Sequence, residues 1–292
     1  MFLIVGGDSE IGAAASRAIR ERGLPVVATT RRRDRIGPDS PFLDISASLD
    51  TWGPPPGTMA ACVCAGIARM AACAADPAGS AHINVDRTLT LIDKLVAGGI
   101  YVLFLSTNQV FDGRTAHVPA DAPYSPVSEY GRQKARTETA LRERMARNAP
   151  VAILRLAKVV SPRMPLLDGW AAGLSAGKPI SAFGDMVLAP TPIDLLCAVI
   201  GGLMKDRASG IFQLTGPRDE SYADVARFIA AQLGAAPSLV RETSARSAGL
   251  PEGATPPNTT LDSRLVCDRY RLEVPDIWQV IEDTIPMGAG RK

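Results

Sequence analysis

Short apolar runs alternate with helical patterns along the first half of the chain. The runs predict strands, because each is brief and bounded by turn-forming residues, and apolar residues recur between them at helical spacing. The predicted strands are FLIVGG (2–7), PVVATT (25–30), PFLDI (41–45), MAACVCAG (59–66), YVLFLST (101–107), VAILRLAKVV (151–160) and SGIFQLTG (209–216). Strands that alternate with helices indicate right-handed crossovers and a parallel sheet covered on both faces. The pattern therefore predicts an α/β fold with a doubly wound parallel sheet.

The regularity changes after residue 160. Proline- and glycine-rich segments there interrupt both the strand and the helix patterns. We expect one larger domain over 1–160 and a smaller lobe over 161–292, with the segment around 188–216 returning to the main sheet. In a doubly wound sheet, ligands bind outside the carboxyl ends of the strands.

Composition narrows the class of protein. The 292 residues carry a formal net charge of +2, which gives no sign of a nucleic-acid or membrane partner. Five cysteines in apolar settings and only two histidines form neither a disulfide framework nor a metal-binding spacing. The chain enters an apolar strand at once, and no apolar run could span a bilayer. We expect a cytoplasmic protein with reduced thiols and no metal.

The turn between the first strand and the first helix indicates a cofactor. In VGGDSEIG, Gly6, Gly7 and Gly12 allow backbone amides to approach a phosphate at the helix N-terminus, although Ser9 stands at the usual middle glycine. A tight turn without a ligand is the alternative interpretation. In its position at the first strand–helix junction, the motif favours a dinucleotide.

The end of the second strand indicates which dinucleotide. An NAD site usually has a carboxylate there, whereas this strand ends in ATTRRRD. Arg31 or Arg32 would form charge-assisted bonds to a 2′-phosphate, so NADP is preferred and NAD is the alternative. Asp8 and Glu10 in the glycine loop count against this preference.

A hydroxyl, a phenol and an ammonium are expected to converge at the sheet edge. The strand at 101–107 ends at Thr107, and Tyr130 and Lys134 follow one helical turn apart. Alone, such a pair occurs in many ordinary helices. Its position beside a predicted cofactor loop favours a role in proton delivery.

In this arrangement the chain resembles the extended short-chain dehydrogenase/reductases, specifically the dTDP-4-dehydrorhamnose reductase family. The resemblance covers nearly the whole chain and implies a Rossmann-type dinucleotide domain. It is carried, in order, by VGGDSEIG, FLDI, CAG, INVD, STNQVFDG, EYGRQK, ILRLAKVV, DMVLAPTPIDLL, GIFQLTG and PPNTTLD. It implies a nucleotide-sugar substrate and, by analogy, a homodimer.

The resemblance assigns roles to the converging residues. Tyr130 would donate a proton to the carbonyl oxygen, Lys134 would lower the pKa of the phenol and bind the nicotinamide ribose, and Thr107 would hold the substrate oxygen. Further cofactor contacts are expected from Gly6, Ser9, Glu10, Ile11, Gly12, Arg31, Arg32, Asp44, Ile45, Ala65, Gly66 and Asn84. Substrate contacts are expected from Thr107, Asn108, Gln109, Tyr130 and Lys158.

Residue inventory favours reduction over the other reactions of these relatives. Dehydration needs an additional acid and base beside Thr107, where the chain has Asn108 and Gln109, and STNQVFDG supplies no epimerase base. Simple reduction of the ketone of a 4-keto-6-deoxy sugar nucleotide requires only Thr107, Tyr130 and Lys134.

The sugar side departs from the family pattern. Asn108 and Gln109 replace Asp and Tyr, Lys158 replaces a tryptophan, and Thr255 replaces an arginine. These changes leave two alternatives open. One is a non-catalytic NADP-binding regulatory subunit of a partner enzyme, and the other is a different sugar-nucleotide enzyme such as an epimerase.

Overall fold

The computed structural model describes residues 1–162, 164–250 and 253–285. Its centre is a six-stranded parallel sheet with the strand order β10-β5-β4-β3-β1-β2. The strands are β1 (Phe2–Val5), β2 (Val26–Ala28), β3 (Ala60–Val63), β4 (Tyr101–Thr107), β5 (Val151–Leu156) and β10 (Gly210–Leu214). The order reverses between β1 and β3, which is the point where doubly wound folds bind ligands. The predicted fold class is confirmed.

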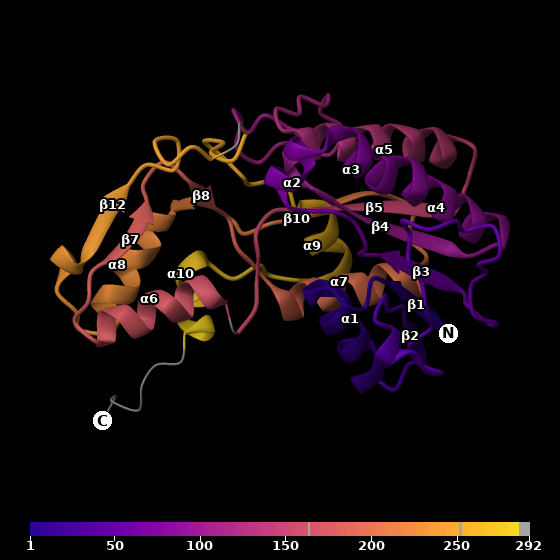
Figure 1. The fold of residues 1–292 in the computed structure, drawn as a ribbon, viewed down its shortest axis with the longest axis horizontal. Coiled ribbons are helices and arrows are strands. Elements are labelled where there is room, and N and C mark those ends of the chain that lie inside the picture. Colours follow the sequence, from indigo (N-terminus) through magenta and orange to yellow (C-terminus); the bar gives the residue numbers. More distant parts are fainter. Residues whose placement is uncertain (163, 251–252, 286–292) are drawn as a thin grey trace.

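Helices cover both faces of this sheet (Figure 1). One face carries α1 (Glu10–Glu21), α7 (Ile193–Asp206) and α9 (Arg264–Tyr270), and the other carries α4 (Thr88–Ala97) and α5 (Glu129–Ala146). The helices α2 (Met70–Ala75) and α3 (Pro77–Ala81) lie on the side of α5. Successive strand side chains point to opposite faces, so each strand contributes to two separate apolar layers.

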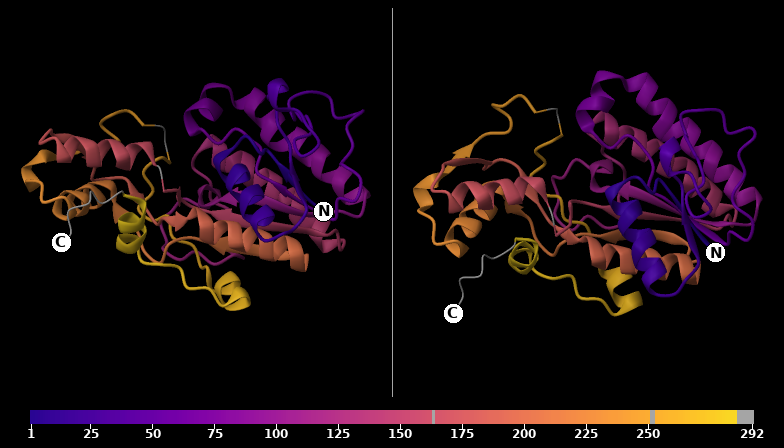
Figure 2. Two further views of the ribbon diagram at one scale, coloured as in Figure 1. Left: turned by 90° about the horizontal axis from the view of Figure 1, so that it is seen from below. Right: turned by 60° about the horizontal axis from the view of Figure 1, so that its bottom comes forward.

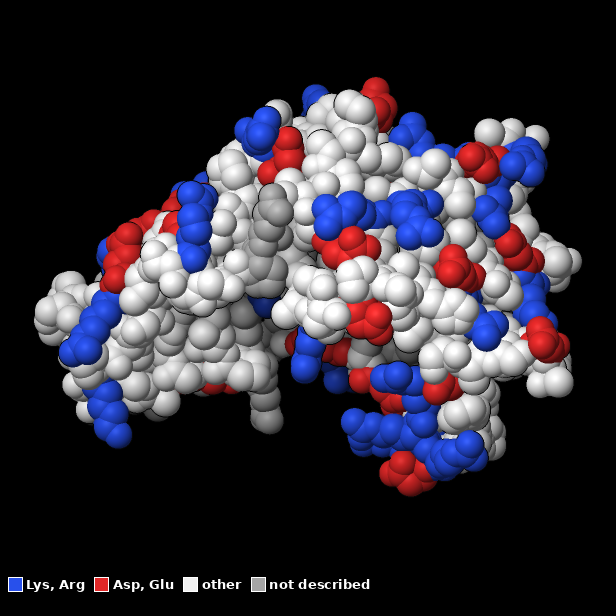
Figure 3. Space-filling view, turned by 45° about the horizontal axis from the view of Figure 1, so that its top comes forward, with Lys and Arg blue, Asp and Glu red and all other residues white. Residues whose placement is uncertain are grey.

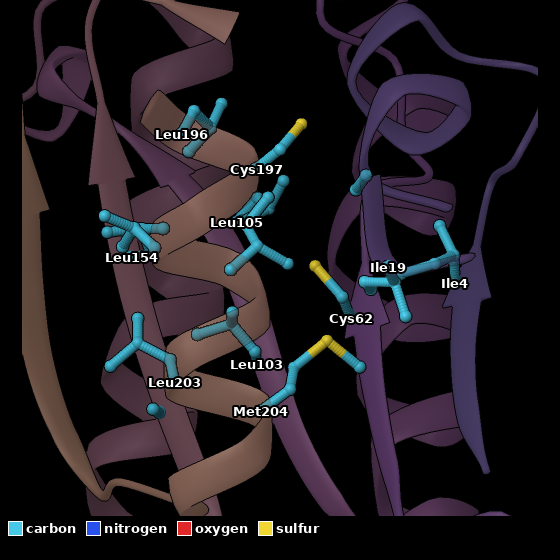
Figure 4. Close-up of a cluster of buried hydrophobic side chains, with 14 of the residues drawn as sticks. Ile4, Ile19, Cys62, Leu103, Leu105, Leu154, Leu196, Cys197, Leu203 and Met204 are labelled. Atoms are coloured by element: carbon cyan, nitrogen blue, oxygen red, sulfur yellow. The ribbon is translucent and has the colours of Figure 1, made fainter. Parts of the chain in front are cut away.

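The apolar layer between α7 and the sheet packs β4 and β5 against this helix. Leu103 and Leu105 of β4 and Leu154 of β5 contact Leu196 and Leu203 of α7 in an apolar cluster (Figure 4). Burying side chains of this size contributes roughly 1.5–3 kcal/mol each relative to exposure. The rigid layer fixes the carboxyl ends of β4 and β5, where the functional side chains follow.

The remaining elements form a smaller part beside the sheet (Figure 2). They are α6 (Pro165–Ser175), β7 (Ile180–Phe183), β8 (Val187–Leu188), β11 (Glu220–Ser221), α8 (Tyr222–Gln232), β12 (Val240–Thr243) and α10 (Ile277–Thr284). An apolar cluster centred on α6, α8 and α10 is separate from the two layers of the sheet. The chain crosses through β6 (Val159–Val160), which pairs with β9 (Thr191–Pro192), and returns to the main sheet at β10.

One predicted strand is wrong. The stretch 41–45 forms only an isolated bridge to the end of β2, between Phe42 and Thr30. Pro41 has no N–H to donate, and the carboxylate of Asp44 accepts from the amide and hydroxyl of Ser46, which turns the chain away. The apolar pattern over 81–99 is typical of one helix, but residues 82–87 form a π-helical turn before α4.

In the described part of the chain, no helix is both long and apolar enough to cross a membrane.

Candidate active site

A groove runs along the carboxyl ends of the strands, across the point where the strand order reverses. It has two adjoining sections that share the segment 64–67, directly after β3. One section extends to Thr107, Tyr130 and Lys134, and the other extends to the glycine loop and the end of β2. Figure 3 shows the molecule hollowed between its larger and smaller parts.

The glycine loop is tight enough to require glycine at two positions. A Cβ on Gly12 would lie 2.3 Å from the carbonyl oxygen of Gly6, and a Cβ on Gly6 would lie 2.8 Å from the backbone nitrogen of Ala65. Gly6 also has a φ of 92°, which favours glycine. The loop therefore places the N-terminus of α1 close against the segment after β3.

Ser9 replaces the middle glycine without disturbing the turn. Its hydroxyl caps α1 by accepting from the amide of Gly12 at 3.1 Å, and it donates to the carbonyl of Gly6 at 2.7 Å. Ser9 lines the groove and Ile11 lines its catalytic section. Glu10 lines neither section, and its carboxylate accepts a hydrogen bond from Ser161 instead.

Carboxylates and one arginine line the far end of the groove. The Asp8 carboxylate accepts from the hydroxyl of Thr30 at 2.9 Å and from the amide of Arg31 at 2.8 Å. Asp44 lies nearby, where hydrogen bonding from Ser46 lowers its pKa and the charge of Arg31 lowers it further. Arg31 lines this section, as Asp44 and Ile45 do, whereas Arg32 does not.

Thr107, Tyr130 and Lys134 come together in the catalytic section. Thr107 ends β4, and Tyr130 and Lys134 lie in the first turns of α5, which Ser128 caps by accepting from the amide of Gly131 at 3.0 Å. The Lys134 ammonium donates to the carbonyl of Leu105 at 2.7 Å. It also lies 6.0 Å from the centre of the Tyr130 ring. The strand end and the helix start therefore form one site.

Burial dominates the charge states of this pair. It raises the pKa of the Tyr130 phenol far above its ordinary value and lowers the pKa of Lys134 to about 8. The family resemblance implies that Lys134 lowers the pKa of the phenol. In this structure the desolvation of Tyr130 determines the direction instead, so the phenol is protonated at neutral pH.

Asn84 does not line the groove, but it hydrogen-bonds to the segment that does. Its side-chain oxygen accepts from the amide of Ile67 at 2.7 Å, and its amide nitrogen donates to Gln133 at 2.7 Å. It is buried in the π-helical turn, a feature common at functional sites. Asn84 thus ties the segment after β3, which includes Ala65 and Gly66, to α5.

The residues expected to contact substrate do not all reach the groove. Asn108 accepts from the Thr107 hydroxyl at 3.3 Å, and Gln109 accepts from the Ser128 hydroxyl at 3.2 Å. Neither lines the section that holds Tyr130. Lys158 is partly buried beyond the end of β5, where desolvation lowers the pKa of its ammonium and the carboxylate of Glu10 opposes the change.

The structure adds residues that the sequence did not single out. Cys64 and Ile67 line both sections of the groove, and Val159 lines the catalytic section. Thr29 accepts from the amide of Gly6 at 3.0 Å and so supports the glycine loop. Their positions after β3, after β5 and at the end of β2 could have indicated them, since ligands meet strand ends.

Comparison with known proteins places this geometry in a family. The family model described as RmlD substrate binding domain matches residues 1–285. The chain belongs to this family. No curated protein matches it in sequence.

Solved structures of this family and of related enzymes share the fold. A hypothetical dTDP-4-dehydrorhamnose reductase from Sulfolobus tokodaii is 21% identical with a TM-score of 0.74, and the alignment covers 94% of this chain and 95% of that one. The dTDP-4-dehydrorhamnose reductase of Bacillus anthracis, solved with NADP, is 16% identical with a TM-score of 0.78 over 96% of each chain. A UDP-glucose 4-epimerase from Thermotoga maritima, solved with UDP-glucose, is 19% identical with a TM-score of 0.78, covering 97% of this chain and 96% of that one. At these identities the likeness establishes the fold.

Proposed function

We propose that this member of the RmlD family reduces the ketone of a nucleotide-linked 4-keto-6-deoxy sugar with NADPH. The observation that carries the proposal is the convergence of Thr107, Tyr130 and Lys134 in one groove that continues to the glycine loop. Reduction needs a proton donor and a hydride donor, and no further acid or base.

The groove fits a dinucleotide. A side chain on Gly6 would clash with Ala65 in the segment after β3, and one on Gly12 would clash with the carbonyl of Gly6 within the loop, so the backbone at this end of the groove stays bare. The amides at the N-terminus of α1 would bind a diphosphate, and Asp44 would accept hydrogen bonds from the adenosine. A nicotinamide bound in the catalytic section would supply the hydride.

The protein residues supply the proton and the orientation. Tyr130 would donate its phenolic proton to the carbonyl oxygen, which agrees with a phenol that burial keeps protonated. Thr107 would donate a hydrogen bond to the same oxygen and hold it in line. Lys134 would bind the nicotinamide ribose and stabilise the negative charge that develops on Tyr130.

Arg31 and Asp8 would affect the preference between NADPH and NADH in opposite directions. Arg31 favours a 2′-phosphate, whereas the Asp8 carboxylate beside it would repel one. We therefore propose NADPH as the preferred cofactor, with NADH also accepted.

The nucleotide sugar would extend towards Gln109 and Lys158, where the Lys158 ammonium would attract its diphosphate.

Turnover assays with the Tyr130→Phe variant test this function. NADPH oxidation is followed with a panel of 4-keto-6-deoxy sugar nucleotides for the wild-type and variant proteins. We expect oxidation with one sugar, a loss of roughly a hundredfold or more in kcat for the variant, and an unchanged Kd for NADPH. Tight NADPH binding without oxidation of any sugar would instead support a regulatory subunit, and the panel would then be replaced by a search for its partner enzyme.

A further inference from the structure

A buried ion pair lies directly behind the catalytic residues. Glu138 of α5 and Arg155 of β5 have fully buried side chains, and their charged atoms approach to 2.7 Å. Such a pair contributes little net stability, because desolvation of both charges offsets their attraction. An apolar pair would hold α5 to the sheet as well, so the charges indicate a different role.

The carboxylate is fully occupied by donors. Glu138 accepts from Arg155 through Nε and Nη2, from the Ser106 hydroxyl at 2.5 Å and from the Tyr124 hydroxyl at 3.0 Å. The guanidinium is also satisfied, since its Nη1 donates to Gln213 at 3.0 Å and to the carbonyl of Ala120 at 2.9 Å. A fully satisfied buried network is rigid and specifies one arrangement of its members.

One hydrogen bond of this network, from Ser106, adjoins the proposed reaction centre, and Lys134 lies one helical turn from Glu138. Ser106 directly precedes Thr107 on β4, and Lys134 lies four residues before Glu138 on the same face of α5. The Ser106–Glu138 hydrogen bond therefore joins the end of β4 to α5 at the level where Thr107 and Tyr130 must meet.

The charges around Lys134 are few. Its ammonium faces the carbonyl of Leu105 and the ring of Phe104 on β4, with the Tyr130 ring on its own helix. The thiols of Cys64 and Cys73 and the carboxylate of Glu138 are the titratable groups that favour its charged form, and Glu138 has the largest effect. Glu138 is itself paired with the guanidinium of Arg155, so Lys134 faces a buried ion pair with the carboxylate on its own helix.

We infer that Glu138, fixed by Arg155, is a positioning residue that sets the end of β4 against α5 and maintains the positive charge of Lys134. This role rests on the proposed function for its effect on catalysis. Its electrostatic part belongs to the folded protein and needs no turnover to be measured.

The test compares a variant that removes the pair with one that removes a neighbouring hydrogen bond. Glu138→Gln combined with Arg155→Met deletes both charges and leaves no unpaired guanidinium. Tyr124→Phe is the matched control, because it deletes one donor to the same carboxylate and retains its charge and its bond to Ser106. Titration of 13Cε-labelled lysine by NMR reports the pKa of Lys134, and the chain has six lysines, which keeps the spectrum simple.

In the double variant we expect the pKa of Lys134 to fall, because Glu138 is the group that most favours the ammonium, and in Tyr124→Phe to stay unchanged. Where turnover is measurable, the alkaline limb of the kcat profile should move by the same amount with KM unchanged. A double variant that folds with an unaltered Lys134 pKa would overturn the inference. An equal fall in the pKa of Lys134 in the Tyr124→Phe variant would also overturn it. The lysine result stands even if no sugar is reduced, which separates it from failure of the proposed function.

Ser106→Ala tests the positioning part if the double variant does not fold. This variant retains the ion pair and removes the bond from β4 to Glu138, and the alanine still lines the catalytic section, as Ser106 does. We expect kcat to fall about tenfold, which corresponds to about 1.4 kcal/mol, with the Kd for NADPH unchanged. A kcat within twofold of the wild-type value would overturn the positioning role.

Discussion

Lys134 occupies a position that stability alone would not select. Burial lowers the pKa of its ammonium from 10.5 to about 8, because the charged form is poorly solvated in the folded state. Between these pH values the unfolded chain binds more protons, and the free energy of unfolding therefore rises with pH. Below pH 8 both states are protonated and the full cost is present.

Lys134→Met should therefore stabilise the protein at pH 7 while it removes activity. We expect the free energy of unfolding to increase by about 1–2 kcal/mol, after the lost hydrogen bond to Leu105 is subtracted. Urea unfolding at pH 7 and at pH 10 measures this, and the gain should shrink at the higher pH. A less stable Lys134→Met protein at pH 7 would contradict the assignment of burial as the dominant effect.

Asp8 is expected to limit the preference for NADPH. Its carboxylate is held at the end of β2 by Thr30 and by the amide of Arg31, a donor that a 2′-phosphate would otherwise use. Asp8→Asn removes the charge and should strengthen NADPH binding about tenfold relative to NADH, since about 1.4 kcal/mol corresponds to tenfold. Fluorescence titration with both cofactors measures the ratio.

Asp34→Asn is the matched control for Asp8. Asp34 lies in the same arginine-bearing loop but is exposed and does not line the groove. An equal change in the NADPH to NADH ratio for both variants would indicate a general effect of net charge rather than a specific repulsion by Asp8.

At the scale of single elements, the glycine loop and α1 depend on a contact that only glycine permits. Gly12→Ala would place a Cβ 2.3 Å from the carbonyl oxygen of Gly6. We expect a loss of about 1–3 kcal/mol in stability and at least a tenfold weaker Kd for NADPH, because the loop must move. Thermal unfolding and fluorescence titration measure the two effects.

Gly169→Ala provides the comparison in another helix. A Cβ at Gly169 of α6 meets no atom within 4 Å. Alanine is the better helix former, so this variant should be more stable by about 0.5–1 kcal/mol and bind NADPH normally. Equal destabilisation by the two alanines would mean that helix propensity, rather than the close approach, governs Gly12.

The elements also show how far sequence reasoning extends. Continuous apolar runs identified every strand of the main sheet, since parallel strands are buried on both faces. The stretch 41–45 has a strand-like composition, but Pro41 and the turn at Asp44 restrict it to one bridge. The glycine loop and the Tyr130–Lys134 pair could be predicted from the sequence because both are patterns within a short stretch of the chain.

Contacts between distant segments could not be read in the same way. Arg155 appears in the sequence as a charge inside an apolar strand, but nothing identifies Glu138 as its partner. Asn84 was expected at the cofactor, whereas its hydrogen bonds to Ile67 and Gln133 depend on how three segments pack. The raised pKa of Tyr130 likewise depends on burial, which only the assembled groove determines.

At the scale of the whole molecule, the two parts have separate apolar cores. The layers of the sheet contain residues of its covering helices, and the third cluster joins α6, α8 and α10. All the groove residues that we assign to NADPH lie between Val5 and Val159 and thus belong to the larger part. We propose the two parts as domains that respond differently to ligands.

Calorimetry with added ligands tests this proposal. NADPH at a hundred times its Kd should stabilise the larger domain by about 2.7 kcal/mol and raise its unfolding midpoint by roughly 5 °C. The transition of the smaller domain should not move, because no proposed NADPH contact comes from it. A nucleotide sugar that bridges the two parts should then raise both midpoints. If NADPH alone moved both transitions equally, the two cores would unfold as one cooperative unit and the proposed division into domains would be wrong.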